Sequence, residues 1–324
     1  MPSSISRTRT TSRDARRLTP AALLALLLAL VLALTACGSD AGAGSDAAAE
    51  SSDSAWPVTV TGADGDLTIE ERPEAIVSLS ATSTEMLFAI GAGDQVTAVD
   101  DTSNYPTDAP VTDLSAFTPN AEAIAGYEPD LVILSNDLNG IVDALDSLAV
   151  PTLLLEAAAT VDDTYAQLET LGEATGHAEE ADEVIADVQD RIATAVASVP
   201  DDAEGMRVYH ELDPSFFSAD STTFIGSIYA LFGLENIADG ADATAGGYPQ
   251  LSAEYVVGQA PDLVVLADTK CCEQSAETVA ERPAFDTVPA VKEGRVLAAD
   301  DDIASRWGPR IADFAESVAG ALQG

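Results

Sequence analysis

The chain has 324 residues, of which 47% are hydrophobic, and its formal net charge is −41. Only 14 Lys and Arg stand against 55 Asp and Glu. Nucleic-acid binding requires clustered cations that neutralise phosphates, so this composition excludes it and favours solubility and basic partners.

The first 36 residues have the composition of a secretory signal peptide. Five Arg between residues 7 and 17 precede an apolar run at 21–34, which is shorter than the roughly 20 residues of a membrane-spanning helix. The segment Leu34-Thr35-Ala36-Cys37 is similar to the lipobox of bacterial lipoproteins, where a lipidated cysteine follows small residues. We therefore expect a lipid anchor on Cys37 at the extracytoplasmic face of the cell membrane. The alternative is a secreted protein with an unmodified cysteine at its cleavage site.

Residues 37–56 are predicted to be the lipidated cysteine and a flexible linker, because Gly, Ser, Ala and Asp dominate and nothing there can be buried. Loss of the signal removes five Arg and one Asp and leaves a mature charge of about −45. The remaining chain exceeds an average single domain, which suggests two lobes or one large α/β unit.

Residues 57–161 are predicted to form an N-terminal α/β lobe. Residues 76–99 have the pattern of a strand, a polar loop and a helix that ends at Gly91, with Ser83 as the expected N-cap. Residues 121–135 have the pattern of a short helix, a turn at Pro129 and an apolar strand. Near-continuous apolar strands of this kind belong to sheets that helices cover on both faces.

Residues 162–200 are predicted to be the helical connection between two lobes. Apolar residues recur at helical spacing in its second half. Gly172 and Gly176 predict a break between a first helix and a longer second one. Such a connection predicts a rigid two-lobed body with limited closure.

Residues 201–324 repeat the pattern of the first lobe. The segment AEYVVGQAPDLVVLA at 253–267 aligns without gaps with AEAIAGYEPDLVILS at 121–135. Upstream, residues 207–238 have the strand, loop and helix order of 76–99, with Thr222 as the expected N-cap. The sequence therefore predicts an α/β fold in which two similar α/β lobes are joined by a single long helix.

The sequence offers little support for an enzyme. It contains no nucleophile elbow, P-loop, H-E-x-x-H or dinucleotide fingerprint. With only His177 and His210, it predicts no multi-histidine metal site and no resident cofactor. A lipid-anchored hydrolase remains the less favoured alternative, and an adhesin or scaffold without a small ligand is another.

Loops that follow the first strand of each lobe are the best candidates for a ligand site, because ligands of α/β units gather where strands end. Arginine pairs with anionic oxygens and aromatic rings cover apolar ligand surface. The candidate ligand-binding residues are Ser80, Thr82, Tyr105 and Phe117 in the first lobe and His210, Glu211, Phe216, Phe217, Arg306 and Trp307 in the second. The alternative for Phe216 and Trp307 is a place in the core.

Glu122 and Glu254 occupy the same position in the two copies of the repeat, near the start of equivalent helices. Alone, each carboxylate would indicate only solubility and a favourable helix N-terminus. As a pair they present one carboxylate per lobe, which suits a two-fold symmetric partner with basic patches.

Cys271 and Cys272 are adjacent in an exported chain. They are expected either to form a vicinal disulfide or to remain thiols, and the sequence leaves both open.

The ordered segments STEMLFAIGAGDQVTAV, NAEAIAGYEPDLVILS, TFIGSIYALFGLENIAD, LSAEYVVGQAPDLVVLAD and GRVLAADDDIASRWGPRI resemble the ferric-siderophore and cobalamin class of periplasmic substrate-binding proteins. The resemblance implies two α/β lobes joined by one long helix, with a ligand held between them. It also implies that Glu122 and Glu254 dock on arginines of an ABC permease dimer, which works with an ATPase. Arg306 falls in the last cleft loop, where siderophore binders often place a cation.

The resemblance favours a monomeric, non-enzymatic surface lipoprotein that captures a ferric siderophore or similar metal chelate. Cobalamin is the close alternative and heme a further one. The cobalamin-binding member of the class has aromatic residues where this chain has Thr102 and, within one residue, Ala116, although Phe117 is next to the latter. His210 and Tyr105 match the axial ligands of heme binders only loosely.

Overall fold

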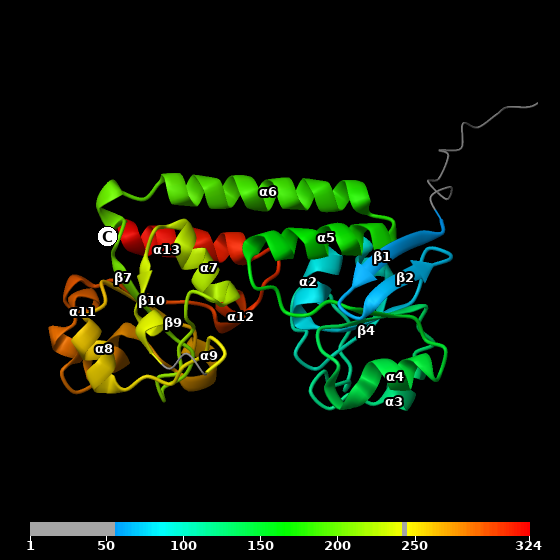
Figure 1. The fold of residues 1–324 in the computed structure, drawn as a ribbon, viewed down its shortest axis with the longest axis horizontal. Helices are drawn as coiled ribbons and strands as arrows, with labels where there is room; N and C mark the ends of the chain where they lie inside the picture. Colours follow the sequence, from blue (N-terminus) through cyan, green and yellow to red (C-terminus); the bar gives the residue numbers. More distant parts are fainter. Residues whose placement is uncertain (1–55, 242–244) are drawn as a thin grey trace, which may run out of the picture. The chain divides into compact units, whose positions relative to one another are not determined.

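The computed structural model describes residues 56–241 and 245–324, all within one compact unit at 52–324 (Figure 1). The predicted signal peptide and Cys37 lie outside the described residues. The chain enters the unit through an antiparallel hairpin of β1 (Val58–Gly62) and β2 (Gly65–Ile69). Val60 and Ile69 anchor this hairpin in the core of the first lobe.

The N-terminal lobe is built on a parallel sheet in the order β4-β3-β5-β6. Its strands are Ile76–Leu79 (β3), Val96–Val99 (β4), Leu131–Leu134 (β5) and Thr152–Leu154 (β6). All residues of β3 and β5 are buried, as the continuous apolar pattern predicts for a sheet with two covered faces. The helices of the lobe are Ala81–Ala89 (α2), Ala121–Ala125 (α3) and Ile141–Asp146 (α4).

The C-terminal lobe has a second parallel sheet in the order β10-β9-β7-β8. Its strands are Arg207–Glu211 (β7), Glu235–Asn236 (β8), Leu263–Leu266 (β9) and Val296–Ala298 (β10). In both lobes the second strand flanks the first, the first flanks the third and the third flanks the fourth. The shared order confirms the two similar lobes that the sequence repeat predicts.

The remaining helices of the second lobe are mostly short. They are Phe224–Leu231 (α7), Ala253–Gln259 (α8), Thr269–Cys272 (α9), Ala276–Ala280 (α10), Pro289–Glu293 (α11), Asp301–Ser305 (α12) and Ile311–Gln323 (α13). The N-caps of α2 and α7 are Ser80 and Thr223, not Ser83 and Thr222. In each loop another hydroxyl residue accepts the capping hydrogen bond. Helix α2 therefore starts three residues earlier than expected and α7 one residue later.

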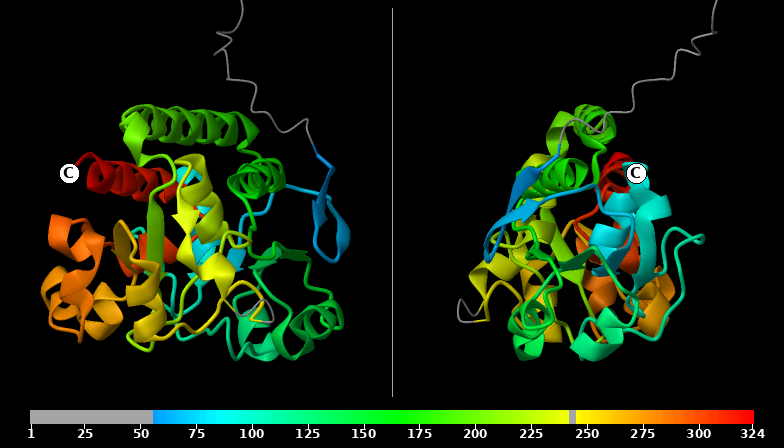
Figure 2. Two further views of the ribbon diagram at one scale, coloured as in Figure 1. Left: turned by 60° about the vertical axis from the view of Figure 1, so that its left-hand side comes forward. Right: turned by 90° about the vertical axis from the view of Figure 1, so that its right-hand side faces the viewer.

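Two helices connect the lobes, with the break where the glycines predict it. Helix α5 (Val161–Thr175) ends at Gly176, whose φ of 76° suits glycine, and α6 (Ala178–Ala197) follows. A 20-residue helix is about 30 Å long, and α6 crosses from one lobe to the other above α5 and α13 (Figures 1 and 2). A Cβ on Gly172 would lie 2.6 Å from Cβ of Ala181, so this glycine allows α5 and α6 to pack closely.

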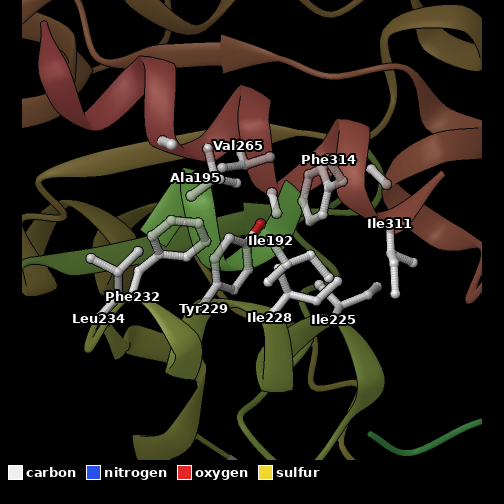
Figure 3. Packing of buried hydrophobic residues seen from close by; sticks show 14 of the residues in the cluster. Ile192, Ala195, Ile225, Ile228, Tyr229, Phe232, Leu234, Val265, Ile311 and Phe314 are labelled. Carbon is white, nitrogen blue, oxygen red and sulfur yellow. The ribbon is translucent and has the colours of Figure 1, made fainter. Parts of the chain in front are cut away.

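The core of the second lobe joins α6, α7, α13 and the sheet (Figure 3). Ile192 of α6, Tyr229 of α7 and Phe314 of α13 meet around Val265 of β9. This packing holds the last helix of the chain against the connection between the lobes. No helix among the described residues is both long and apolar enough to span a bilayer.

Candidate functional site

Ser80 and Thr82 lie at the carboxyl end of β3, where α2 begins. The Ser80 Oγ accepts a hydrogen bond of 3.2 Å from the Ser83 N–H and so caps the helix. Both side chains are buried in this structure. They therefore shape the first turn of α2 at the edge of the sheet where the sequence predicts the ligand site.

The equivalent edge of the second lobe carries a buried acidic cluster. Glu211 ends β7, and its carboxylate accepts hydrogen bonds from Nη1 and Nη2 of Arg282 at 2.6 and 2.5 Å. The Tyr209 hydroxyl donates to the same carboxylate at 2.9 Å. Asp268, after β9, is fully buried, and its two side-chain oxygens have no hydrogen-bond partner among the described atoms. Burial and the nearby Glu211 carboxylate raise the pKa of Asp268 to about 7.

Phe216 packs beside this acidic cluster. Its φ of 69° is unusual for a residue with a side chain. The ring stacks on Phe285 at 6.2 Å, and the guanidinium of Arg282 lies 5.3 Å from its centroid. Phe216 is thus half-buried within the second lobe, while its neighbour Phe217 is 38% exposed.

The structure places His210 in the core and not at an open surface of the cleft. Its ring is fully buried between Tyr229 and Phe314, and Nδ1 lies 2.6 Å from the Tyr229 hydroxyl. Burial lowers the pKa of His210 to about 3 and keeps the ring neutral. Glu211 is likewise fully buried, so neither side chain presents surface to a ligand in this conformation.

Arg306 joins the two lobes. Its Nη1 donates to Glu85 Oε1 at 2.8 Å and to Asn104 Oδ1 at 2.9 Å. Its Nη2 donates to the Thr102 carbonyl at 3.0 Å and to Asp302 at 2.9 Å. Three of these four acceptors belong to the N-terminal lobe, so Arg306 connects the lobes at a seam beside α2.

Arg310 reinforces the same seam. It forks onto the Glu85 carboxylate, with Nε at 2.8 Å and Nη2 at 2.5 Å. Its guanidinium lies 4.1 Å from the Tyr105 ring centroid. Only 1% of the Glu85 side chain is exposed. We call Glu85, Asp302, Arg306 and Arg310 the seam cluster.

Trp307 lies between the lobes and is half-buried against both hydrophobic cores. Its indole N–H donates to Gln167 at 3.0 Å, and its carbonyl accepts from Thr164 at 3.0 Å. Both partners are on α5, so Trp307 anchors the loop between α12 and α13 to the connecting helices.

Tyr105 and Phe117 are the exposed aromatic candidates of the first lobe, at 44% and 67%. Tyr105 lines a hollow of about 320 Å³ together with Arg310 and Phe88. The exposure of Phe117 leaves its ring available for an apolar contact. The structure thus brings Tyr105, Arg306 and Trp307 to the seam and leaves Phe117 and Phe217 at the surface of separate lobes.

Glu122 and Glu254 occupy equivalent exposed positions at the second residue of α3 and of α8. The helices are capped alike, by the side chains of Asn120 and Ser252. Neither glutamate belongs to an ion pair among the described residues. In Figure 1, α3 and α8 lie on the lower side of the two lobes, away from α6.

Cys271 and Cys272 are joined by a disulfide in α9. The backbone N–H groups of Lys270 and Cys271 donate to the Asp301 carboxylate at 3.0 and 2.9 Å. Lys270 also bridges to Asp300 and Asp302. Helix α9 is therefore tied to α12, which carries Arg306 at its C-terminal end.

Residue patterns did not identify Glu85, Asp268 and Arg282. Glu85 is the only charged residue between positions 75 and 93, which is a signal in the sequence, whereas Asp268 and Arg282 stand near other charged residues. No cluster of three or more His, Cys, Asp or Glu suited to a metal occurs in the part of the chain that the structure describes.

Comparisons with known proteins identify the family. The periplasmic binding protein family model matches residues 76–303. The ABC transporter substrate-binding lipoprotein YvrC of Bacillus subtilis, which is uncharacterized, is 30% identical over 86% of this chain and 89% of its own length. The cobalamin-binding protein of Halobacterium salinarum is 32% identical over 82% of this chain and 74% of its own.

A solved structure from Staphylococcus epidermidis, described as a possible iron-binding (periplasmic solute-binding) protein, shares the fold. It superposes with a TM-score of 0.67 at 24% identity, over 78% of this chain and all of the other. This agreement matches the two parallel sheets of the described residues to known two-lobed binding proteins. The chain therefore belongs to the periplasmic binding protein family, and it is a substrate-binding, non-enzymatic component of an ABC importer.

Proposed function

We propose that this protein captures a corrinoid of the cobalamin type between its lobes and delivers it to an ABC permease. The sequence alone ranked a ferric siderophore first and cobalamin second. The cobalamin-binding relative at 32% identity supports the opposite order. The choice of ligand class rests on how the cations of the chain are paired.

The nine Lys and Arg after the predicted signal peptide all fall within the described residues. Seven of them form ion pairs with carboxylates, and among these nine described residues only Arg72 and Lys292 form none. Lys292 is exposed on α11, and Arg72 instead contacts the Thr175 carbonyl and His177. The cations near the seam are thus already neutralised, which favours a ligand without net negative charge. Cyanocobalamin is such a ligand, whereas ferric tris-catecholates are polyanions.

Heme fits these residues less well. Protein-bound heme iron takes an axial ligand such as His or Tyr. His210 is buried, and the exposed Tyr105 packs its ring against Arg310. The heme propionates would also require cations that the seam does not offer.

Native purification tests the ligand class. Protein produced in a corrinoid-making bacterium is expected to retain a corrinoid, which absorption spectra and mass spectrometry identify. A heme Soret band, or the charge-transfer band of a ferric siderophore, would contradict the proposal. Co-purification of an uncharged ferric hydroxamate would also contradict it and would support the ferric siderophore that the sequence ranked first.

Delivery is proposed to depend on Glu122 and Glu254, which would each contact a basic patch on one permease subunit. Exposure at equivalent helix starts in both lobes supports this role. Changing both to Lys is expected to abolish corrinoid uptake and to leave ligand affinity intact. A matched control changes Glu179 and Glu281, which are also exposed, to Lys. Uptake that survives in the first variant, or fails equally in the control, would contradict docking through this pair.

Membrane attachment through Cys37 is proposed to keep the protein near its importer. The 18 residues at 38–55 that follow it have a coil reach of roughly 20–25 Å. Cys37→Ala is expected to release the protein into the medium, as fractionation and mass spectrometry of the N-terminus would show. Retention of the variant in the membrane would contradict lipid anchoring at this cysteine.

A further inference from the structure

The contacts of the seam cluster leave Arg306 almost no donors for a ligand. An arginine side chain has five N–H donors. Four of those on Arg306 are taken by Glu85, Asn104, Thr102 and Asp302, which leaves only its Nε. Arg306 therefore lies beside the expected ligand site with its charge neutralised and four of its five donors already in hydrogen bonds.

The carboxylate that binds both arginines is costly to separate from them. With 1% of its side chain exposed, Glu85 has no access to water that would replace its partners. An anionic ligand that took either arginine would leave this buried charge unpaired, which is strongly unfavourable. The pairing thus disfavours such a ligand.

The seam also borders the carboxyl end of β3, where ligands of α/β lobes gather. A Cβ on Gly308 would lie 3.3 Å from Glu85 Oε2 and 3.7 Å from Thr82 Cγ2. The loop that carries Arg306 and Arg310 therefore packs directly on the first turns of α2. Removing the Glu85 charge would leave the two arginines at the edge of that site.

Further carboxylates surround the cluster on the side of α9. Lys270 is paired with Asp300 and Asp302, and Asp302 also accepts from Arg306. The three cations Lys270, Arg306 and Arg310 face the carboxylates Glu85, Asp300 and Asp302, and the Asp301 carboxylate beside Lys270 adds a fourth negative charge. Outside this cluster the acidic surface of the protein repels anions.

We propose that Glu85 is a specificity-determining residue, which neutralises Arg306 and Arg310 at the seam so that the protein selects uncharged chelates over polyanionic ones. The inference rests on the proposed function, because it assumes that the ligand binds between the lobes. It goes further in assigning ligand charge selection to one carboxylate that does not itself contact the ligand.

The test compares Glu85→Gln with the wild-type protein. The probes are cyanocobalamin and a ferric tris-catecholate of charge −3, titrated by calorimetry at two salt concentrations. Glu85→Gln is expected to lower the preference for cyanocobalamin over the tris-catecholate at least tenfold. The gain in tris-catecholate affinity is expected to shrink at high salt, since it comes from freed arginines.

Glu316→Gln is the matched control. It removes the same charge and breaks one of the two ion pairs of Arg191, which keeps Asp313, at the contact between α6 and α13. Its selectivity is expected to equal that of the wild type. An equal loss of selectivity in both variants, or no loss in Glu85→Gln, would overturn the inference. If Glu85→Gln does not fold, Glu85→Asp replaces it, because the shorter side chain cannot hold both arginines. Its preference for cyanocobalamin over the tris-catecholate is expected to fall about threefold, and an unchanged preference would overturn the inference.

The two proposals fail in distinguishable ways. If the wild type does not bind cyanocobalamin but Glu85→Gln still gains affinity for the tris-catecholate, the corrinoid proposal fails and the role of Glu85 stands. If the wild type binds cyanocobalamin and Glu85→Gln gains nothing, only the role of Glu85 fails.

Discussion

Arg306 and Glu85 are 221 positions apart in the chain, yet their side chains meet at 2.8 Å. The sequence identified Arg306 because cations are scarce. It did not identify Glu85, because 55 carboxylates were equally plausible partners. Which charge is buried against which is decided by how the lobes pack, and local patterns do not contain that information.

His210 had a usable signal that the sequence interpretation did not apply. Its strand lies in a parallel sheet that is covered on both faces, so the side chains that point to either face are buried. A histidine in such a strand is expected to be a core residue. Because His210 lies near the strand end, the sequence left open both a place in the cleft and a place in the core.

Removal of the Glu85 side chain is expected to destabilise the protein severely. Glu85→Ala leaves two mostly buried arginines without their shared partner, and breaking such a buried pair costs about 3–5 kcal/mol. Urea denaturation measures the free energy of unfolding. Glu316→Ala, which breaks the more exposed pair with Arg191, is expected to cost about 1 kcal/mol or less. Equal losses would show that the seam cluster is not specially stabilising.

Asp268 is expected to make stability depend on pH. Its pKa is about 7 in the folded protein, where Glu211, Tyr209 and Arg282 surround it, against 3.8 for an unperturbed Asp. Between these values the folded state holds the proton more tightly, so the free energy of unfolding falls as pH rises from about 4 to 7. Above pH 7 this contribution is lost.

Asp268→Asn removes the titrating group and is expected to flatten that part of the pH profile. Denaturation midpoints at pH 5, 6, 7 and 8 measure the slope. The variant should lose less stability than the wild type between pH 5 and pH 8. Identical slopes for the two proteins would contradict the raised pKa.

At the scale of elements, sequence predicted most of the fold. The duplicated PDLV segments became β5 and β9 in sheets of the same strand order, and Gly176 ends α5 as expected. The shape of the connection was less predictable. Periodicity shows that a segment is helical, but how α5 packs beside α6 depends on their contact faces.

Gly172 is expected to control that packing. Gly172→Ala places a methyl group where Cβ of Ala181 is only 2.6 Å away, so α5 and α6 must separate at a cost of about 1–3 kcal/mol. A Cβ on Gly320, inside α13, would meet no heavy atom within 4 Å. Gly320→Ala is therefore expected to stabilise by about 0.5–1 kcal/mol. Thermal unfolding checks both, and a neutral Gly172→Ala would contradict close packing of α5 on α6.

At the scale of the whole molecule, the lobes are joined by more than the helical connection. Arg306, Arg310 and Trp307 form contacts with the N-terminal lobe and with α5. A two-lobed body with such a seam is expected to change little on ligand binding, as the sequence already predicted. Small-angle scattering with and without cyanocobalamin should give the same radius of gyration within about 1 Å, and a larger decrease would indicate hinge closure.

The most direct test of capture between the lobes is calorimetric titration of the mature protein with cyanocobalamin. The proposed function predicts saturable 1:1 binding. It also predicts a stabilisation of about 2.7 kcal/mol when the free ligand is at 100 times its dissociation constant. No heat of binding and no thermal shift with cyanocobalamin, together with saturable binding of a ferric siderophore or of heme, would contradict it.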